Sequence, residues 1–390
     1  MNITLTQSVR IAGVEQAAGT KLTVSDDIGE DLIRRKSATN DNPTFEPEPV
    51  MATKNLTGGS TISNGTGSAA FNACEWFGAS PSASASTNTA AIQAALNAGG
   101  RVTLMTPGVY LSNFSHSIHS DTSLSIGPGV TIKQAPGNNK FFIANSNYAA
   151  ESVAAVGNIT AVTSVGSNTM SLATINFSGA PPVSVGGYAQ VTGDTTNKYN
   201  GVWKVVSVGA SSLSFLVPGA SAPQSSGYIK VAPANANITI ECDGYIDYDE
   251  LNNSSGENSL NVMGVVFNRV ANVRVTRANI INVAKYGFLL SNNYDCEIRN
   301  LFAVTGSDGV HCTGITNNFT LSGFKGVTGD DCFIWGANDT ATGYVPVDGT
   351  GPCNGLLVED VMIRSSVSRA VLLMPSFILI IGLLELSLYQ

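Results

Sequence analysis

Hydrophobic and polar positions between about Asn258 and Met374 follow a pattern that repeats along the chain. Successive apolar segments start 23, 22, 23 and 38 residues apart, and a second short strand is expected after each of the first four. A helical period is absent, and a period in the low twenties made of strands and turns is typical of a β-solenoid. We therefore predict an all-β fold, a single-stranded parallel β-helix. The first segments are Gly264–Phe267, Gly287–Leu290, Gly309–Cys312, Cys332–Trp335 and Ala370–Leu373, the second strands lie near Val273–Val275, Cys296–Ile298, Phe319–Leu321 and Leu356–Val358, and the long step contains a Gly/Asp/Pro-rich insert near Asn338–Pro352.

The residue before each apolar segment should belong to a column on the surface of this solenoid. In stacked coils, equivalent residues of neighbouring coils lie roughly 4.8 Å apart. Asp308, Asp331 and Arg369 occupy three successive positions of the column, and Asp330 is the sequence neighbour of Asp331. Three carboxylates and a guanidinium are therefore expected to converge on one patch. The whole column consists of Met263, Tyr286, Asp308, Asp331 and Arg369.

Residues 1–36 are expected to form a small separate unit. Alternation over Ile3–Ile11 and the segment Leu22–Val24 predict strands, and Asp26–Lys36 predicts a short helix with Ser25 as its N-cap. A disordered leader is the alternative. Asn, Pro and Glu then dominate, so residues 37–72 are predicted to be a linker.

The β-helix is predicted to start within residues 73–150, behind a capping helix. Residues Thr89–Asn97 have the helical pattern, with Thr87 or Asn88 as the N-cap and two glycines at the end. A helix at the end of a solenoid covers core that an open coil would expose. His116 and His119 lie in a polar loop and are predicted to be ordinary surface residues.

Between residues 151 and 231 the solenoid spacing disappears, and short strands alternate with Gly, Pro and Ser turns. This pattern predicts a small all-β domain inserted into the β-helix. The solenoid resumes over residues 232–374, which carry the acidic column. The expected strands of the insertion are Asn158–Val165, Thr169–Ile175, Tyr188–Thr192, Val202–Val208, Leu213–Val217 and Tyr228–Val231.

The two ends of the chain differ from the rest. Residues 375–390 are strongly apolar, but the run Phe377–Leu384 is shorter than the roughly 18–20 residues of a membrane span. We expect a truncated or frame-shifted reading frame here rather than an anchor, and no membrane span. At the other end, Met1–Arg10 lacks a basic segment followed by an apolar run, which argues against a signal peptide.

Charge and cysteine content narrow the possible partners. The net charge is −8 without a Lys/Arg cluster, which argues against a nucleic-acid partner. Metal-ligand spacings of Cys or His are not present, so neither a metal nor a cofactor is expected. Cys296, Cys312 and Trp335 are predicted to point inward, whereas Cys332 and Cys353 flank the insert and could form a disulfide in an oxidising compartment.

Several motifs resemble those of known β-helical families. Ser307-Asp308-Gly309 and Gly329-Asp330-Asp331-Cys332 resemble the N-T-D-G and G-D-D-C motifs of polygalacturonases. The segment from Phe77-Gly78 to Pro107-Gly108-Val109-Tyr110 resembles the entry of pectate-lyase-like β-helices, which are widespread in phage tail spikes, and Tyr199–Trp203 resembles part of a small β domain of phage tail proteins. The resemblance covers about residues 73–374. It implies a right-handed β-helix in a phage or prophage tail-spike protein, a homotrimer joined to the tail or baseplate through its N-terminus. Such a protein is part of the virion tail and acts outside the cell on a bacterial surface polysaccharide.

Carried over residue by residue, the resemblance assigns the acids to an inverting glycoside hydrolysis without a cofactor. Asp330 matches the general acid, and Asp308 and Asp331 match the pair that activates water. His311 should face outward near the acids, because the residues on either side of it point inward. We predict that His311 and Arg369 bind substrate.

Other interpretations remain open. The family's G-H-G motif falls where this chain has Gly351-Pro352-Cys353, and its R-I-K motif has no match. Ser-Asp-Gly and Gly-Asp-Asp are also ordinary turn sequences, so the acids could be turn residues. The remaining alternatives to a hydrolase are a spike that recognises a glycan receptor without cleaving it and a polysaccharide lyase.

Overall fold

The computed structural model divides the chain into two compact units, Met1–Gly59 and Ser60–Gln390. The structure describes five strands within residues 2–40. It further describes residues 71–148, 155–165, 170–194, 199–219, 229–253, 263–336, 354–366, 368–369 and 371–374. The predicted helix Asp26–Lys36, most of the predicted linker, the insert near Asn338–Pro352 and residues 375–390 lie outside the described residues.

The first unit contains short antiparallel strands. Strands β4, β1 and β5 form a three-stranded sheet in that order, and β2 and β3 form a hairpin. Because β5 pairs with β1, the first unit extends beyond the predicted boundary at residue 36. The strands are β1 (Asn2–Leu5), β2 (Val9–Ile11), β3 (Val14–Gln16), β4 (Lys21–Thr23) and β5 (Ala38–Asn40).

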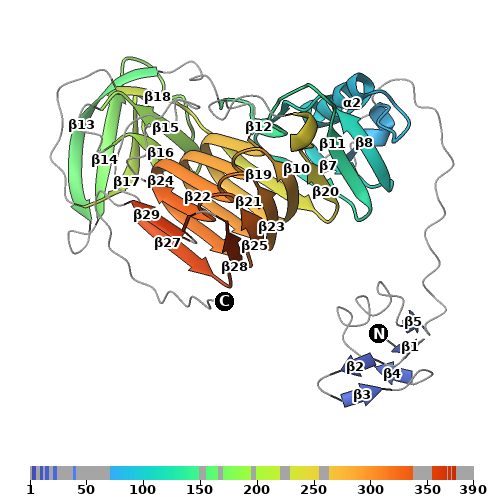
Figure 1. Cartoon of the computed structure of the whole chain (residues 1–390). Coiled ribbons are helices and arrows are strands. Elements are labelled where there is room, and N and C mark those ends of the chain that lie inside the picture. The colour runs from blue at the N-terminus through green and yellow to red at the C-terminus, as the bar shows by residue number, and fades with distance from the viewer. Residues whose placement is uncertain are drawn as a thin grey trace. The chain divides into compact units, whose positions relative to one another are not determined.

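A helix precedes the coils of the second unit, as predicted (Figure 1). It follows β6 (Phe71–Ala73) and the short 3-10 helix η1 (Cys74–Phe77), and α2 spans Ala85–Ala98. The helix begins before the predicted Thr89, and its N-cap is Ser84 rather than Thr87 or Asn88. The Ser84 hydroxyl accepts a hydrogen bond from the backbone N–H of Thr87 at 3.2 Å. Asn88 is buried instead, and its side chain donates to the carbonyl of Leu111, which ties the helix to the first coil.

Beyond α2, the strands of each coil pair in parallel with the strands one coil further along the chain, as in a parallel β-helix (Figure 1). The first coils contain β7 (Gly100–Leu104), β8 (Gly108–Ser112), β9 (His116–Ile118), β10 (Thr122–Ile126), β11 (Val130–Gln134) and β12 (Ile143–Asn145). The later coils contain β19 (Asn235–Cys242), β20 (Tyr245–Asp247), the 3-10 helix η2 (Glu250–Asn252), β21 (Val265–Val283), β22 (Phe288–Arg299), β23 (Leu301–Thr305), β24 (Val310–Ser322), β25 (Lys325–Thr328), β26 (Phe333–Gly336), β27 (Asn354–Glu359), β28 (Met362–Ser365) and β29 (Val371–Met374).

The register of these coils confirms the repeat predicted from the sequence. Val265, Phe288, Val310, Phe333 and Val371 are paired from coil to coil at the same position of each first strand. The second strands are also in register, through the successive pairs of Val273, Cys296, Phe319 and Leu356.

One turn of each coil has a left-handed backbone, which explains part of the composition. Asn237, Asn272, Asp295, Asn318 and Gly355 come immediately before these second strands, with φ between 50° and 69°. Only Gly adopts this conformation without strain, and Asn and Asp tolerate it better than other residues. The abundance of Asn and Gly is therefore a requirement of the repeated turn.

The core of the β-helix is a continuous column of inward-facing apolar side chains. Cys296, Cys312 and Trp335 belong to it, as predicted, and Phe319 stacks on Phe333 with ring centroids 5.8 Å apart. His119 is exposed, as expected. The prediction for His116 was wrong, because its side chain is buried between coils, where Ser112 and Phe142 surround the ring.

Six strands between β12 and β19 form a closed barrel, in the order β13-β14-β17-β16-β15-β18. The barrel packs on the β-helix through Val202, Ala236 and Ala271, and Tyr188 of the barrel lies against Tyr294 of β22. Figure 1 shows the barrel strands in colours from green to yellow-green. They are β13 (Ala155–Val165), β14 (Met170–Phe177), β15 (Tyr188–Thr192), β16 (Gly201–Val208), β17 (Ser212–Pro218) and β18 (Ile229–Pro233), close to the predicted ranges.

Within the part of the chain that the structure describes, no helix has the length and apolar character needed to cross a membrane.

Candidate functional site

The candidate site lies at the turns that lead into the first strand of successive coils, and the predicted column is present there. The N–H of Gly287 donates to the carbonyl of Asp308 at 3.0 Å, and the N–H of Gly309 donates to the carbonyl of Asp331 at 3.1 Å. Cys332 donates in the same way to the carbonyl of Arg369. The backbone ladder itself therefore places the two aspartates and the arginine on neighbouring coils.

Glycines allow these turns to stack closely. A Cβ atom on Gly309 would lie 2.6 Å from the carbonyl oxygen of Cys332 and would overlap the ring of Phe324. A Cβ atom on Gly329 would overlap the carbonyl of Gly306 one coil earlier. The glycines of the Asp-Gly and Gly-Asp-Asp motifs are thus needed for the close approach of the coils.

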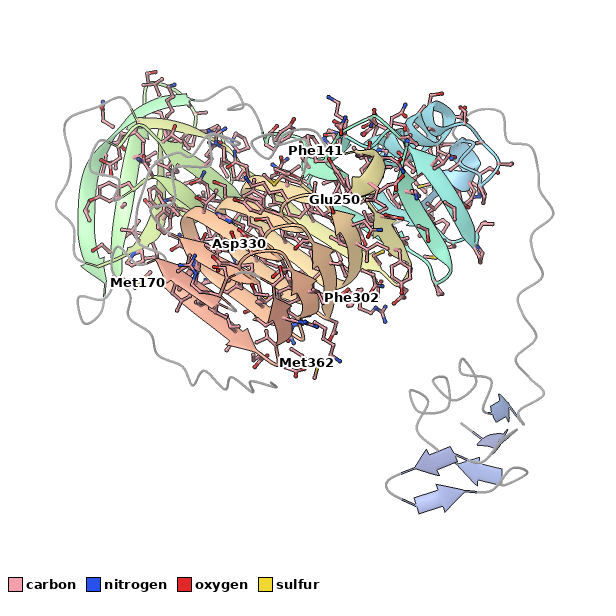
Figure 2. All side chains as sticks on the ribbon, in the orientation of Figure 1. Phe141, Met170, Glu250, Phe302, Asp330 and Met362 are labelled. Carbon is pink, nitrogen blue, oxygen red and sulfur yellow. The ribbon has the colours of Figure 1, made fainter. Side chains whose placement is uncertain are left out.

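An open groove of about 590 Å³ runs over these turns. Acidic, basic and apolar side chains line it together, and Figure 2 labels Asp330 on this part of the coil. The lining residues come from four successive coils, so a bound molecule would contact several coils at once. They are Ala284, Lys285, Tyr286, Gly306, Ser307, Asp308, His311, Gly329, Asp330, Asp331, Ile334, Arg369 and Leu372.

The three carboxylates meet in this groove but differ in burial. One oxygen of each of Asp308, Asp330 and Asp331 lies within 4.8 Å of the others. Asp308 and Asp331 are only 2% exposed. Asp330 is partly exposed, so its carboxylate is the accessible one of the three.

Asp331 is held by Arg369 from the next coil. Its Oδ1 accepts hydrogen bonds from the backbone N–H and the Nε–H of Arg369, both at 3.0 Å, and its Oδ2 accepts one from Nη2 at 3.0 Å. The hydrogen bond to the carboxylate is the main cause that raises the pKa of Arg369. The guanidinium stays more than half exposed, so it holds Asp331 from the groove side.

Asp308 is held by His311, three residues further along the chain. The His311 Nδ1 lies 2.6 Å from Oδ2 of Asp308, and the Ser307 hydroxyl donates to Oδ1 at 3.1 Å. The His311 ring stacks on Tyr286 with centroids 4.4 Å apart and planes 15° apart. Burial raises the pKa of Asp308, and the contacts with His311 and Ser307 counteract part of that rise.

Asp330 has a backbone held by hydrogen bonds, and its carboxylate accepts no hydrogen bond from the described residues. Its N–H donates to the carbonyl of Ser307, and its carbonyl accepts from the hydroxyls of Thr328 and Ser365. Among the described residues, no side chain or backbone group hydrogen-bonds to its carboxylate. Asp330 can therefore approach a bound molecule without breaking a hydrogen bond between its carboxylate and any described residue.

The donor set does not identify a metal or cofactor. The spacing of the three carboxylates is compatible with a shared cation, but Asp308 and Asp331 each have a positively charged or protonatable partner already. Cys332, beside this cluster, is buried, forms no disulfide with another described cysteine and lies 3.1 Å from the Thr328 hydroxyl. Cys353 lies outside the described residues, so the suggested disulfide is not part of the described structure.

The structure brings together all five residues predicted for the site: Asp308, Asp330, Asp331, His311 and Arg369. It also adds residues that sequence reasoning did not assign to it. Tyr286 belonged to the predicted column, and this position could have identified it as a neighbour of the acids. Lys285 and Ser307 had no distinguishing signal beyond their place in the turns.

Comparisons with known proteins give similar structures but no family. No protein-family model matches the chain, and no curated protein sequence matches it. The tailspike protein of Pseudomonas phage LKA1 is 15% identical over 77% of this chain and 59% of its own, with a TM-score of 0.45. A family 28 exopolygalacturonase of Yersinia enterocolitica is 17% identical over 78% of this chain and 50% of its own, with a TM-score of 0.44. The tailspike of Acinetobacter baumannii bacteriophage AP22, solved with a capsular saccharide, is 11% identical over 76% of this chain and 58% of its own, with a TM-score of 0.33. The chain spans less than two thirds of the length of each of these three proteins.

Proposed function

We propose that this protein is a phage or prophage tail spike that hydrolyses glycosidic bonds of a bacterial surface polysaccharide. The observation that carries the proposal is the groove with three carboxylates in different environments, one accessible and two held by partners. Glycoside hydrolysis needs two carboxyl groups with different roles around the same bond. The Ser-Asp-Gly and Gly-Asp-Asp-Cys motifs, which resemble those of polygalacturonases, support the same assignment.

In the proposed mechanism, Asp330 is the general acid. It is accessible and its carboxyl has no other partner among the described residues, so it can donate a proton to the oxygen of the leaving sugar. The bond between that oxygen and the anomeric carbon breaks, and a water oxygen bonds to the same carbon from the opposite face. The water proton passes to a carboxylate, so the products are a free reducing end and a shortened chain, with inversion at the anomeric carbon.

Asp308 and Asp331 are proposed to hold and activate this water. An ionised carboxylate offers about four acceptor positions. Arg369 uses three positions on Asp331, and His311 and Ser307 use one each on Asp308. Both carboxylates therefore retain capacity for a water molecule while their orientation is fixed. Arg369, whose guanidinium is exposed to the groove, is also proposed to contact the sugar.

The test is release of reducing ends from a panel of bacterial surface polysaccharides and polygalacturonate. Asp330→Asn keeps the shape of the side chain but cannot supply the proton, so activity should fall by at least about 100-fold while glycan binding is retained. Asp360→Asn, an exposed acid outside the groove, is the matched control and should behave as wild type. Wild-type levels of release by Asp330→Asn would disprove the assignment of the acid.

A spike that binds a glycan without cleaving it is the second candidate. The observation that favours it is that two of the three carboxylates already have partners, as in a structural network. Binding of a polysaccharide without new reducing ends, in wild type and variant alike, would support this function. An unsaturated product absorbing in the ultraviolet would instead indicate a lyase.

The assembly and location follow from the same proposal. We infer a homotrimer that is joined to the phage tail or baseplate through the N-terminal unit and acts at the host cell surface. Its β-helix is inferred to be right-handed, as are about 98% of parallel crossover connections. Light scattering with size exclusion on the full chain tests the trimer directly, and a monomer at micromolar concentration would contradict it.

A further inference from the structure

We propose that His311 is a positioning residue: it holds the Asp308 carboxylate in place for water activation and does not itself bind the sugar. This inference rests on the proposed hydrolase function. It gives His311 a different role from the substrate contact that the sequence predicts. Three observations support this role: the short contact between His311 and Asp308, the restricted position of the His311 ring, and the low solvent exposure of the His311 side chain.

The contact between the two side chains is short and shielded from water. The Nδ1–Oδ2 distance is 2.6 Å, and each side chain is only 3% exposed. An ionised carboxylate has no proton to donate, so the histidine must supply one from Nδ1 when Asp308 is ionised. The two groups therefore act as a unit that shares a proton, and the orientation of one sets the orientation of the other.

The ring of His311 has little freedom to leave this contact. Its backbone lies within the parallel ladder, between Leu289 of the preceding coil and Ile334 of the following coil. Tyr286 covers one face of the ring by stacking at 4.4 Å. The strand that carries His311 and the turn that carries Tyr286 both belong to the regular coils. The histidine therefore presents its Nδ1 to Asp308 from a rigid scaffold. Such support by a second residue is the usual way in which a reacting group is held.

The burial of His311 argues against a direct sugar contact. At 3% side-chain exposure it offers a bound glycan almost no surface, whereas the Arg369 side chain is 57% exposed on the same groove. A side chain that binds a sugar must be accessible to that sugar. His311 lines the groove with little exposed surface, and its Nδ1 is directed at the Asp308 carboxylate.

The pairing also has an electrostatic consequence. Burial is the main cause that raises the pKa of Asp308, and the hydrogen bond and charge of His311 are the next causes, acting in the opposite direction. Removal of the histidine should therefore raise the pKa of Asp308 further and leave less of the ionised base at a given pH. The other charged side chains that line the groove are Lys285, Asp330, Asp331 and Arg369.

The first test is the pH dependence of kcat/KM for reducing-end release in His311→Leu and His311→Asn. In the leucine variant we expect the acidic limb of the profile to move up by about one to three pH units, with KM unchanged. Asparagine replaces the Nδ1 donor by an amide N–H, so it should restore part of the shift. His119→Asn, at an exposed histidine outside the groove, should retain the wild-type profile. A raised KM with an unmoved limb would show substrate contact and would overturn the proposal.

The second test does not depend on activity. The chain has three histidines, so nitrogen-15 NMR of histidine-labelled protein can assign His311 by comparison with the variants. We expect a proton on Nδ1 of His311 in wild type and loss of that preference in Asp308→Ala, with folding verified by thermal melting. If the His311 tautomer is the same in Asp308→Ala as in wild type, the proposed pairing of His311 with Asp308 is wrong, even if the protein cleaves glycans. A wild-type protein that pairs the two groups but cleaves no glycan removes the hydrolase function, and with it the catalytic role of the pair.

Discussion

Acidification is expected to destabilise the first coils of the β-helix through His116. This side chain is 1% exposed, and its Nε2 lies 3.1 Å from the Ser112 hydroxyl. Its Nδ1 has no hydrogen-bond partner among the described residues, and the ring lies edge-on to Phe142 with centroids 5.6 Å apart. No carboxylate forms an ion pair with this ring among the described residues, and its surroundings are removed from water. Burial therefore lowers the pKa of His116 from 6.5 to about 4.

The sign and size of the effect follow from this difference in pKa. In the unfolded chain the imidazole takes up a proton below about pH 6.5, whereas in the folded protein it stays neutral to about pH 4. The contribution of neutral His116 to stability is therefore complete above the unfolded pKa and is lost as the pH falls towards the folded value. Linkage gives a loss of about 2 kcal/mol between pH 7 and pH 5, and about 3 kcal/mol when the loss is complete.

The assay is urea unfolding of wild type and His116→Leu over this pH range. Leucine cannot titrate, so the variant should lose about 2 kcal/mol less than wild type between pH 7 and pH 5, whatever its absolute stability. His119→Leu, at an exposed histidine, should keep the wild-type pH dependence. Equal pH dependence in wild type and His116→Leu would refute the reasoning, because the burial of a neutral imidazole would then have no energetic consequence.

Four further changes test the scaffold and the site. Gly309→Ala should cost about 1–3 kcal/mol by overpacking against the next coil, whereas Gly179→Ala, which has open space around it, should be close to neutral in urea unfolding. Phe319→Ala should lower the free energy of unfolding by about 3–5 kcal/mol, because it removes a fully buried ring that stacks in the core, and a loss under about 1 kcal/mol would contradict this. Asn318→Val should cost about 1–2 kcal/mol at a left-handed turn position, while Asn318→Gly should not, and equal melting of the two variants would argue against the turn requirement. Arg369→Lys cannot form the bidentate contact with Asp331, so reducing-end release should fall at least about tenfold, and wild-type activity would show that this contact is dispensable.

The coil register was the part of the fold that the sequence predicted best. In a parallel solenoid the spacing of apolar segments is also the spacing of the coils, so aligning Gly264, Gly287 and Gly309 places Val265, Phe288 and Val310 side by side. A local repeat therefore determines a long-range contact. Few other folds have this property, because their contacts depend on how unlike elements pack.

Local features without a repeat were predicted less well. Ser84 was missed as the N-cap of α2, since serines and alanines upstream of Thr87 give little contrast between loop and helix. His116 was placed on the surface because its sequence neighbours are polar. Its burial depends on Phe142, which lies one coil away, and the spacing that relates β7 to β10 and β8 to β11 is not kept in the longer step from His116 to its partner Ile143.

In the candidate site, too, the features that depend on the repeat were predictable and those that depend on side-chain packing were not. The backbone column that brings Asp308, Asp331 and Arg369 together was predictable, because it needs only the period. The pairing of Asp308 with His311 and the stacking of His311 on Tyr286 were not predictable, because they depend on side-chain directions. The same holds for burial, which differs between Asp330 and Asp331 although they are adjacent in sequence.

The contact between Asp331 and Arg369 shows why register matters more than chain length here. The two residues are separated by the longest step of the repeat, 38 residues. Phe333 nevertheless pairs directly with Val371, so the additional residues do not add a coil between them. The backbone N–H of Arg369 and its guanidinium both reach the Asp331 carboxylate because the ladder resumes at the same position of the coil. A solenoid can therefore accept additional residues between its strands and still bring a guanidinium to a buried acid, provided that the strand after the insertion returns to the same register.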